Sequence, residues 1–416
     1  MRRRATHLLG TAFGPAVALA LVLGLLTPSA GTAAAERPRD GRTADGGPRT
    51  ADGGREEARL RALAERVVAA PNPNPGALLL ARDGSHHSHG TAGVADRAAG
   101  TPMRRDLKFR AGSVTKTFTA TVVLQLVAEH RLRLDDTVQR LLPDQVLPGN
   151  ALSGPPVTVR QLLNHTSGLY DYIDGLLPHF RTLDQYWPRE QLIGIGLAEP
   201  RYFPEPGTRF RYSNTNYLLL DLIVERLTDR DLRTNLERRI FAPLGLRDTS
   251  YPLAKTTIDG AHVHGYADVT PLLPDAPGAT RYDVTGFSPS EAGASGALVT
   301  TADDLARFYR ALLRGRLLPA HLLHRMLTDT VPTTGAAAPP AVGYGLGMYV
   351  YATDCGLAYG HGGSAPGYLT YVLNSRDGRE QLVAHTNWNS FTDTGIDKDF
   401  WAAFQQGYCD PGTVKP

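Results

Sequence analysis

The stretch Phe109-Arg-Ala-Gly-Ser-Val-Thr-Lys-Thr-Phe-Thr-Ala120 joins reactive side chains to an apolar helical run at 122–129. Ser113 and Lys116 stand three residues apart, and positions three apart share one helix face, so we expect both side chains in one cleft. A lysine amine held unprotonated beside a serine hydroxyl can make that hydroxyl nucleophilic. A helix N-terminus also offers unpaired N–H groups to a developing oxyanion.

The composition makes this lysine conspicuous. Only five of the 44 basic residues are lysine, and the others are arginine, which does not lose its proton in proteins. Alone the spacing is a weak signal. With fourteen serines and five lysines, Ser-x-x-Lys is expected by chance in roughly one such chain in six. The assignment therefore needs partners elsewhere in the chain.

The N-terminus is typical of an exported protein. Three arginines at 2–4, an apolar run at 16–26 and three alanines at 33–35 predict a signal peptide over residues 1–35. The apolar run is too short for the roughly twenty residues of a membrane-spanning helix. We expect a secreted, extracellular protein with no membrane span in the mature chain. The glycine-rich repeats that follow predict a flexible linker over 36–55.

Charge and cysteine content exclude some classes of protein. Without the predicted signal peptide the chain has 41 basic and 41 acidic residues, and it has no basic run with interleaved aromatics, so we expect no nucleic-acid partner. Cys355 and Cys409 fit one disulfide in an oxidising compartment, with two free thiols as the alternative. Two isolated cysteines are too few for a metal site, and nothing suggests a metal or an organic cofactor.

The pattern of elements predicts one sheet built from both ends of the chain. Apolar alternation and turn signals predict strands near the N-terminus and over the last hundred residues, whereas the middle is mostly helical. We expect an α/β (α+β) fold, with an antiparallel sheet flanked by N- and C-terminal helices and an inserted, mostly helical lobe. The expected segments are a helix at 56–70, a hairpin at 77–94, strands at 343–351, 356–360, 368–373 and 381–386, and a helix at 394–408. The sheet lobe would comprise 56–112 and 316–416, and the helical lobe 113–315.

Two other stretches carry groups suited to the same cleft. In Tyr212-Ser-Asn214, a tyrosine whose pKa is lowered by a nearby cation can act as general base and then as general acid. Asn214 can hold Lys116 or a substrate amide through its two-sided hydrogen-bonding group. In Gly-His361-Gly-Gly-Ser364, glycines allow close backbone approach to a ligand. We expect a second oxyanion N–H from Ser364 and a polar or cationic edge from His361.

Two further sequence features bear on the assignment. The stretch Leu162-Leu-Asn-His-Thr-Ser-Gly-Leu169 contains His165, for which a structural role is the simplest interpretation.

The His-Gly-Gly triplet also occurs in α/β-hydrolase esterases. That class requires Gly-x-Ser-x-Gly around the nucleophile, which is absent from this sequence, and a triplet that precedes the nucleophile.

Taken together, these motifs resemble the serine beta-lactamase and penicillin-binding superfamily. The closest similarity is to the group of class C beta-lactamases, secreted actinomycete D-alanyl-D-alanine carboxypeptidases and related esterases and D-amino-acid peptidases. The resemblance covers residues 60–405. Three motifs occur in family order, Ser113-Val-Thr-Lys116, Tyr212-Ser-Asn214 and His361-Gly-Gly363, with looser matches at 162–169, 240–246 and 293–300.

The resemblance implies a role for each motif residue. Ser113 would be the acylated nucleophile, Lys116 would set its protonation, and Tyr212 would shuttle the proton. The remaining implied roles are substrate-amide binding by Asn214 and an oxyanion hole from the N–H groups of Ser113 and Ser364. His361 stands where relatives have lysine or histidine, and it would bind substrate together with Gly363.

The resemblance also implies a function. We expect a secreted serine hydrolase that works through an acyl-serine intermediate and resembles a D-alanyl-D-alanine carboxypeptidase acting on peptidoglycan-type peptides. Its partner would be a small peptide, ester or beta-lactam substrate. Esterase, D-amino-acid peptidase or class C-type beta-lactamase activity is the alternative, and a slowly deacylating penicillin-binding or sensor module is a second one.

Two departures weaken the carboxypeptidase interpretation. The middle residue of the triplet, often threonine in the family, is Gly362, and Met348-Tyr-Val-Tyr-Ala352 lacks the arginine that those carboxypeptidases place there. A neutral tyrosine does not replace a bidentate arginine–carboxylate pair. We further hypothesise that His361 becomes charged near pH 6, so that acylation by carboxylate-bearing substrates rises as the pH falls.

Overall fold

The computed structural model describes residues 51–69, 74–176, 182–270, 279–333, 341–389 and 398–409. The predicted signal peptide and most of the predicted linker lie outside these ranges. The linker prediction is wrong at its C-terminal end, because helix α1 (Ala51–Val68) begins five residues before the expected boundary at residue 56. Residues 49–416 form one compact unit, and the boundaries between a sheet lobe and a helical lobe stay a prediction.

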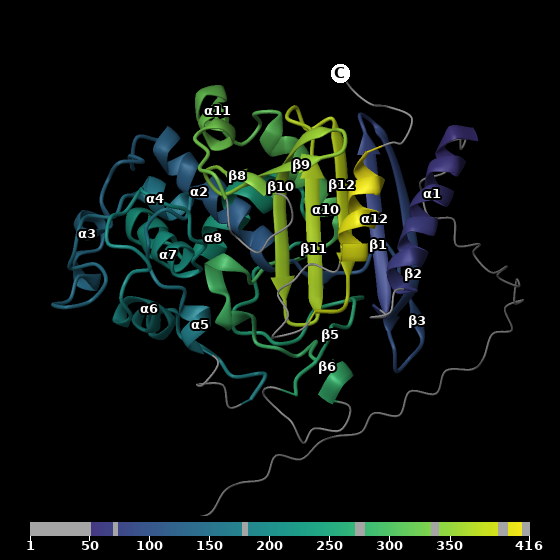
Figure 1. The fold of residues 1–416 in the computed structure, drawn as a ribbon, viewed down its shortest axis with the longest axis horizontal. Coiled ribbons are helices and arrows are strands. Elements are labelled where there is room, and N and C mark those ends of the chain that lie inside the picture. Colours follow the sequence, from purple (N-terminus) through teal and green to yellow (C-terminus); the bar gives the residue numbers. More distant parts are fainter. Residues whose placement is uncertain are drawn as a thin grey trace, which may run out of the picture. The chain divides into compact units, whose positions relative to one another are not determined.

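An eight-stranded antiparallel sheet occupies the centre of this unit (Figure 1), in the order β3-β2-β1-β12-β11-β10-β9-β8. The two ends of the chain meet where β1 pairs with β12, with Leu79 opposite Ala384. The prediction of one sheet assembled from both ends is therefore confirmed. The strands are β1 Gly76–Asp83, β2 His86–Asp96, β3 Thr101–Pro102, β8 Ala341–Tyr344, β9 Tyr349–Thr353, β10 Gly356–Ala365, β11 Tyr368–Asn374 and β12 Glu380–Thr386.

The predicted strand at 343–351 is two strands. The chain reverses between β8 and β9 in a tight turn, in which the Gly345 N–H donates to the carbonyl of Met348 at 2.8 Å. Gly347 takes a φ of +92°, a conformation open to glycine and strained for other residues. The alternating pattern was compatible with one strand, and the glycines allow the reversal.

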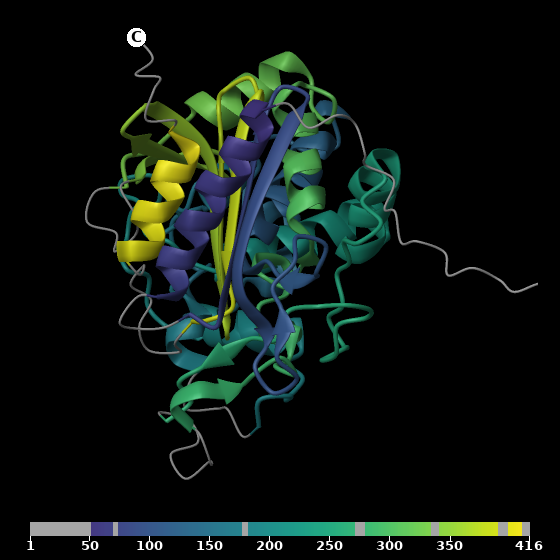
Figure 2. The ribbon, with the colours of Figure 1, turned by 90° about the vertical axis from the view of Figure 1, so that its right-hand side faces the viewer.

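Helices cover both faces of the sheet (Figure 2). The terminal helices α1 and α12 (Lys398–Tyr408) lie on one face, and α10 (Ala302–Leu313) lies on the other. Alternate side chains of β1 explain this layering, because successive strand residues point to opposite faces. Ala77 and Leu79 pack in the core beneath the terminal helices, whereas Leu78 and Leu80 join the larger core on the α10 side.

The central helix α2 (Thr115–Ala128) is buried along most of its length and follows the turn η1 (Gly112–Val114). Among the described residues, no helix combines the length and apolar character needed to cross a bilayer. The other helices are α3 Val138–Leu141, α4 Val159–Leu163, α5 Tyr172–Leu176, α6 Arg189–Ala198, α7 Thr215–Thr228, α8 Leu232–Leu236, α9 Ala242–Leu244 and α11 Ala320–Thr328. Two small ladders pair β4 (Phe109–Arg110) with β7 (Val299–Thr300) and β5 (Tyr266–Ala267) with β6 (Tyr282–Asp283).

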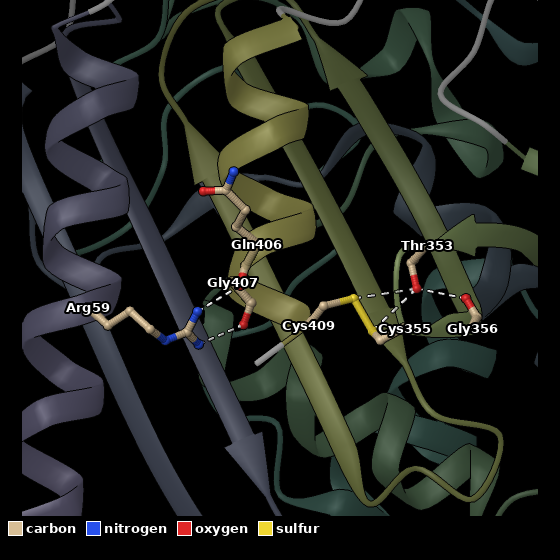
Figure 3. Close-up of a disulfide and its surroundings, with 7 residues drawn as sticks. All are labelled: Arg59, Thr353, Cys355, Gly356, Gln406, Gly407 and Cys409. Carbon is tan, nitrogen blue, oxygen red and sulfur yellow. Dashed lines mark hydrogen bonds between the residues drawn. A yellow bond between two sulfur atoms is a disulfide. The ribbon is translucent and has the colours of Figure 1, made fainter. Parts of the chain in front are cut away.

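A disulfide joins Cys355 to Cys409 across 54 residues of sequence, with the two Cα atoms 5.5 Å apart (Figure 3). The cystine pairing expected from the sequence is confirmed. It ties the turn before β10 to the C-terminal end of α12. Beside it, the Arg59 guanidinium of α1 donates to the carbonyls of Gln406 and Gly407 at 2.7 and 3.2 Å, which satisfies acceptors at the end of α12.

Candidate active site

Ser113 and Lys116 are brought together by the turn that starts α2. Ser113 lies within η1 and remains partly exposed, whereas Lys116 is fully buried in the first turn of α2. The Lys116 Nζ lies 3.1 Å from the Ser113 Oγ. The shared face predicted from their spacing is therefore present, and the amine is within proton-transfer distance of the hydroxyl.

Two other oxygens surround the same amine. The Lys116 Nζ donates to the Asn214 Oδ1 at 2.6 Å and to the carbonyl of Ser295 at 2.9 Å. Burial lowers the pKa of Lys116 to about 7, although the carboxyl groups of Asp171 and Glu291 act in the opposite direction. A lysine with this pKa is neutral in a large fraction of molecules near pH 7.

Asp171 belongs to the site and was not predicted from the sequence. The Asn214 Nδ2 donates to both carboxyl oxygens of Asp171, at 3.2 and 2.9 Å. Since one end of the amide is held by the carboxyl group, its oxygen must face Lys116. Burial raises the pKa of Asp171 to about 6. No motif marked this residue, and its position two residues after the Ser-Gly-Leu169 turn is the only available signal.

Glu291 is a second buried acid that no sequence motif predicted. It lies in the η6 turn (Pro289–Glu291), where its backbone carbonyl accepts a hydrogen bond from the Tyr172 hydroxyl at 2.7 Å. Burial raises the pKa of Glu291 to about 8, and the nearby cations Lys116 and Arg110 partly offset this rise. A carboxyl group that is mostly protonated at pH 7 leaves Lys116 with less anionic stabilisation, which favours the neutral amine.

Tyr212 lies beside the amine, as expected, but its predicted acidity is wrong. The Lys116 Nζ is 4.7 Å from the Tyr212 ring centroid. Burial of the phenol, followed by the effect of Tyr349, raises the pKa of Tyr212 well above its ordinary value, and Ser113 only partly offsets this. The hydroxyl is buried and makes no hydrogen bond of ordinary geometry within the described residues. A neutral tyrosine fits a proton donor better than an initial base.

His165 packs against this tyrosine. Its ring stacks on that of Tyr212 with centroids 4.2 Å apart. The Nδ1 atom accepts the backbone N–H of Ser213 at 3.2 Å and also lies 3.1 Å from the Asn216 Nδ2. Burial lowers the pKa of His165 well below its ordinary value, so the ring is neutral. The geometry gives His165 a positioning role beside Tyr212.

His361 is neutral, which overturns the hypothesis of a cationic edge. The side chain is 1% exposed, and its Nε2 lies 2.9 Å from the Tyr344 hydroxyl. Burial, with a further contribution from Lys116, lowers the pKa of His361 to about 3. The imidazole therefore does not become charged near pH 6. No sequence pattern indicated that Tyr344, Tyr349 and Tyr212 would surround this ring.

Backbone contacts bring β10 against the serine turn. A Cβ added to Gly112 would lie 2.4 Å from the Ser364 carbonyl oxygen, and Gly112 has a φ of +52°. A Cβ added to Gly363 would lie 1.9 Å from the Ala111 carbonyl oxygen. The glycines are needed because one backbone segment packs directly on the other. This contact places the Ser364 peptide beside the peptide that precedes Ser113, which suits a second oxyanion donor.

The antiparallel sheet and the Ser–Lys pair at a helix start define a serine hydrolase with the beta-lactamase/transpeptidase fold. Residues 60–406 match the protein family described as Beta-lactamase, and the chain belongs to that family. Penicillin-binding protein 4 of Amycolatopsis lactamdurans is 31% identical over 317 residues, which cover 72% of this chain and 77% of the relative.

Solved structures agree with this assignment. A D-stereospecific amidohydrolase from Streptomyces sp. is 36% identical with a TM-score of 0.72, and the match covers 86% of this chain and 99% of that chain. D-amino acid amidase from Ochrobactrum anthropi SV3, complexed with L-phenylalanine amide, is 27% identical with a TM-score of 0.74. That match covers 85% of this chain and 97% of that chain.

Proposed function

We propose that this serine hydrolase cleaves amide bonds on the carbonyl side of D-amino acid residues and does not require a free carboxylate on the leaving group. This differs from the D-alanyl-D-alanine carboxypeptidase expected from the sequence, which remains the main competing function. Amides of D-amino acids and peptides with D-residues are the substrate class. The relatives named D-stereospecific amidohydrolase and D-amino acid amidase support this choice.

The neutral His361 is the observation that carries the proposal. A substrate carboxylate needs a cation or a set of strong donors, and the buried imidazole with its lowered pKa offers no positive charge. Gly362 provides no hydroxyl, and 348–352 has no arginine. With these features, the strand edge suits the uncharged leaving group of an amide or an ester.

The reaction proceeds in two stages in this proposal. The Ser113 Oγ attacks the substrate carbonyl and gives its proton to the neutral Lys116, which lies 3.1 Å away. The N–H groups of Ser113 and Ser364 receive the developing oxyanion. Protonated Lys116 and Tyr212 relay that proton to the leaving amine, so the C–N bond breaks, an acyl-serine remains and both side chains are neutral again. Water then attacks the ester carbonyl, its proton passes through the same two groups to the Ser113 Oγ, and the C–O bond to the serine breaks to release the acid and free Ser113.

Matched substrates test the proposal. We expect D-phenylalanine amide to be hydrolysed with a kcat/KM at least about tenfold above that of the L-amide, which is ~1.4 kcal/mol of transition-state discrimination. An N-acylated D-Ala-D-Ala peptide and its C-terminal amide form the second pair, and we expect no advantage for the free carboxylate. A kcat/KM about tenfold higher for the free acid would instead establish a carboxypeptidase.

Acylation of Ser113 is measured directly. Mass spectrometry after incubation with a penicillin should show one covalent adduct on the protein, and Ser113→Ala should show none. Ser288→Ala is a matched control, because this serine is buried outside the motif. An adduct on the Ser113→Ala protein would remove the nucleophile assignment, and an adduct that persists for hours would favour the slowly deacylating module.

A further inference from the structure

A cavity of about 400 Å³ lies at one end of the sheet, next to the C-terminal part of α10. Apart from Ala311, every residue that lines it is an arginine. The five arginines are Arg82, Arg307, Arg310, Arg314 and Arg316. We call this cavity the arginine cavity.

The fold gathers these side chains from separate elements. Arg307, Arg310 and Arg314 recur at spacings of three and four along α10 and its C-cap, which puts them on one helix face. Arg82 comes from β1 and shares a strand face with Leu78 and Leu80, the face on which α10 packs.

The arginine cavity is separate from the serine site. Leu317, the neighbour of Arg316, accepts a hydrogen bond from the Gln125 side chain at 3.2 Å. Gln125 lies nine residues after Lys116 on α2, which is roughly 14 Å along the helix axis. A ligand in the arginine cavity therefore does not touch the acylation machinery.

The positive charge in the cavity is only partly neutralised. Arg307 contacts Asp304 at 3.5 Å, Asp303 is near Arg82, and Asp377 is near Arg314. Arg310 and Arg316 make no ion pair within the part of the chain that the structure describes.

The side chain of Arg82 gives the strongest indication that the cavity binds an anionic ligand. Its Nε atom is buried and has no hydrogen-bond acceptor among the described residues. Burial, followed by the charge of Arg310, lowers the pKa of Arg82.

A favourable interaction with the C-terminal end of α10 explains only part of this cluster of arginines. Cations near a helix C-terminus interact favourably with the macrodipole, which applies to Arg310 and Arg314. Arg82 belongs to a strand, and its orphaned Nε gains nothing from that dipole. A cluster of like charges destabilises the folded state through repulsion unless a bound anion offsets it.

We propose that the arginine cavity binds a ligand that carries two or more negative charges on phosphate groups. Guanidinium groups present planar pairs of N–H donors that match phosphate oxygens, and arginine is preferred over lysine where such bidentate contacts matter. The volume lies within the ~300–1,000 Å³ typical of small-molecule sites. A free oligophosphate and a phospholipid headgroup with two phosphate groups offer the same chemistry to the cavity.

Pyrophosphate is the probe for the test, with isothermal titration calorimetry on the whole chain at low ionic strength. We expect one binding event that weakens at least about tenfold in the Arg82→Gln/Arg310→Gln variant. Arg55→Gln/Arg61→Gln removes the same charge from α1, on the opposite face of the sheet, and should bind as the unmodified protein does. Added sodium chloride should weaken binding, because salt screens exposed charges.

Vesicles distinguish the two sources of phosphate. Arginine-dependent sedimentation with cardiolipin vesicles, whose headgroup carries two phosphate groups, and none with phosphatidylcholine would identify a lipid headgroup, whereas pyrophosphate binding without vesicle binding would identify a free ligand. Thermal melting gives a second readout, in which pyrophosphate should raise the Tm of the unmodified protein and of the α1 control only. No binding of either probe, or equal loss in both double variants, would overturn the proposal.

Discussion

At the scale of single residues, the proposed chemistry depends on the charge state of Lys116. The amine is held by Ser113, Asn214 and Ser295, and Asp171 orients the amide of Asn214. Burial brings the pKa of Lys116 to about 7, where a small change in its surroundings changes the fraction of neutral amine. In the proposed reaction, Asp171 is therefore a positioning residue, and the charges of Asp171 and Glu291 influence the pH range over which Lys116 is neutral.

The acylation rate should fall as the pH drops through about 7, because protonated Lys116 does not accept the serine proton. Stopped-flow measurement of penicillin acylation between pH 5.5 and 9 tests this expectation. The midpoint belongs to the coupled set of groups, not to Lys116 alone. A rate that rises towards pH 6 would contradict this prediction and would restore the hypothesis of a titrating His361.

Asp171→Asn should move that midpoint to lower pH, because it removes a negative charge that raises the pKa of Lys116. It should also lower the maximal rate, by about tenfold or more, since the amide of Asn214 loses its carboxylate acceptor. Asp184→Asn changes an exposed acid that influences the pKa of neither Lys116 nor Asp171, and it should leave the profile in place. A fall in rate without a shift of the midpoint would assign Asp171 a purely structural role.

At the scale of elements, the contact between β10 and the turn before α2 brings together the two N–H groups of the proposed oxyanion hole. The sequence indicated that the glycines around His361 allow close backbone approach to a ligand. The structure shows that Gly363 also allows close approach to Ala111, and that Gly112 does the same for Ser364. Two backbone segments far apart in sequence thus pack without intervening side chains.

Gly112→Ala should destabilise the protein and slow acylation, because the new Cβ meets the Ser364 peptide at a φ of +52°. Gly149→Ala is a matched control, since Gly149 also has a positive φ, of +81°, but open space around it. The left-handed conformation alone costs a non-glycine residue about 1–2 kcal/mol. Urea denaturation should show a larger loss for Gly112→Ala, and only this variant should lose acylation rate. Equal effects of the two substitutions would contradict the proposed contact.

At the scale of the whole described chain, strands from the two ends of the chain pair in the middle of the sheet. Strand β1 pairs with β12, and the disulfide anchors the start of β10 to the end of α12. Cys355 adjoins the first residue of β10, whereas Ser364 lies near its last. The crosslink and the serine site therefore lie at opposite ends of one strand.

Cys355→Ala/Cys409→Ala should lower the free energy of unfolding by ~2–4 kcal/mol, because the crosslink restrains a long loop in the unfolded chain. The acylation rate at 25 °C should stay within about twofold of that of the unmodified protein, since the site lies at the far end of β10. Urea denaturation with and without a reductant measures the stability, and penicillin acylation measures the site. A loss of acylation in the folded variant would show that the crosslink supports the site.

Much of the fold and the identity of the reactive groups followed from the sequence. Local patterns determined the amphipathic face of α1, the hairpin of β1 and β2, and the three-residue spacing of Ser113 and Lys116, because these depend on residues close together in the chain. The two cysteines left only one intramolecular pairing. The family motifs added Tyr212 and Asn214 by resemblance.

Only the tertiary structure decided how those groups are charged. Lys116 meets Asn214 and Ser295 across 98 and 179 residues, and it is their packing that removes water from the amine. Burial of their own side chains also keeps His361 and Tyr212 neutral, whereas the sequence had suggested a cationic histidine and an acidic tyrosine. Desolvation is a property of the assembled core, so no local pattern could reveal it.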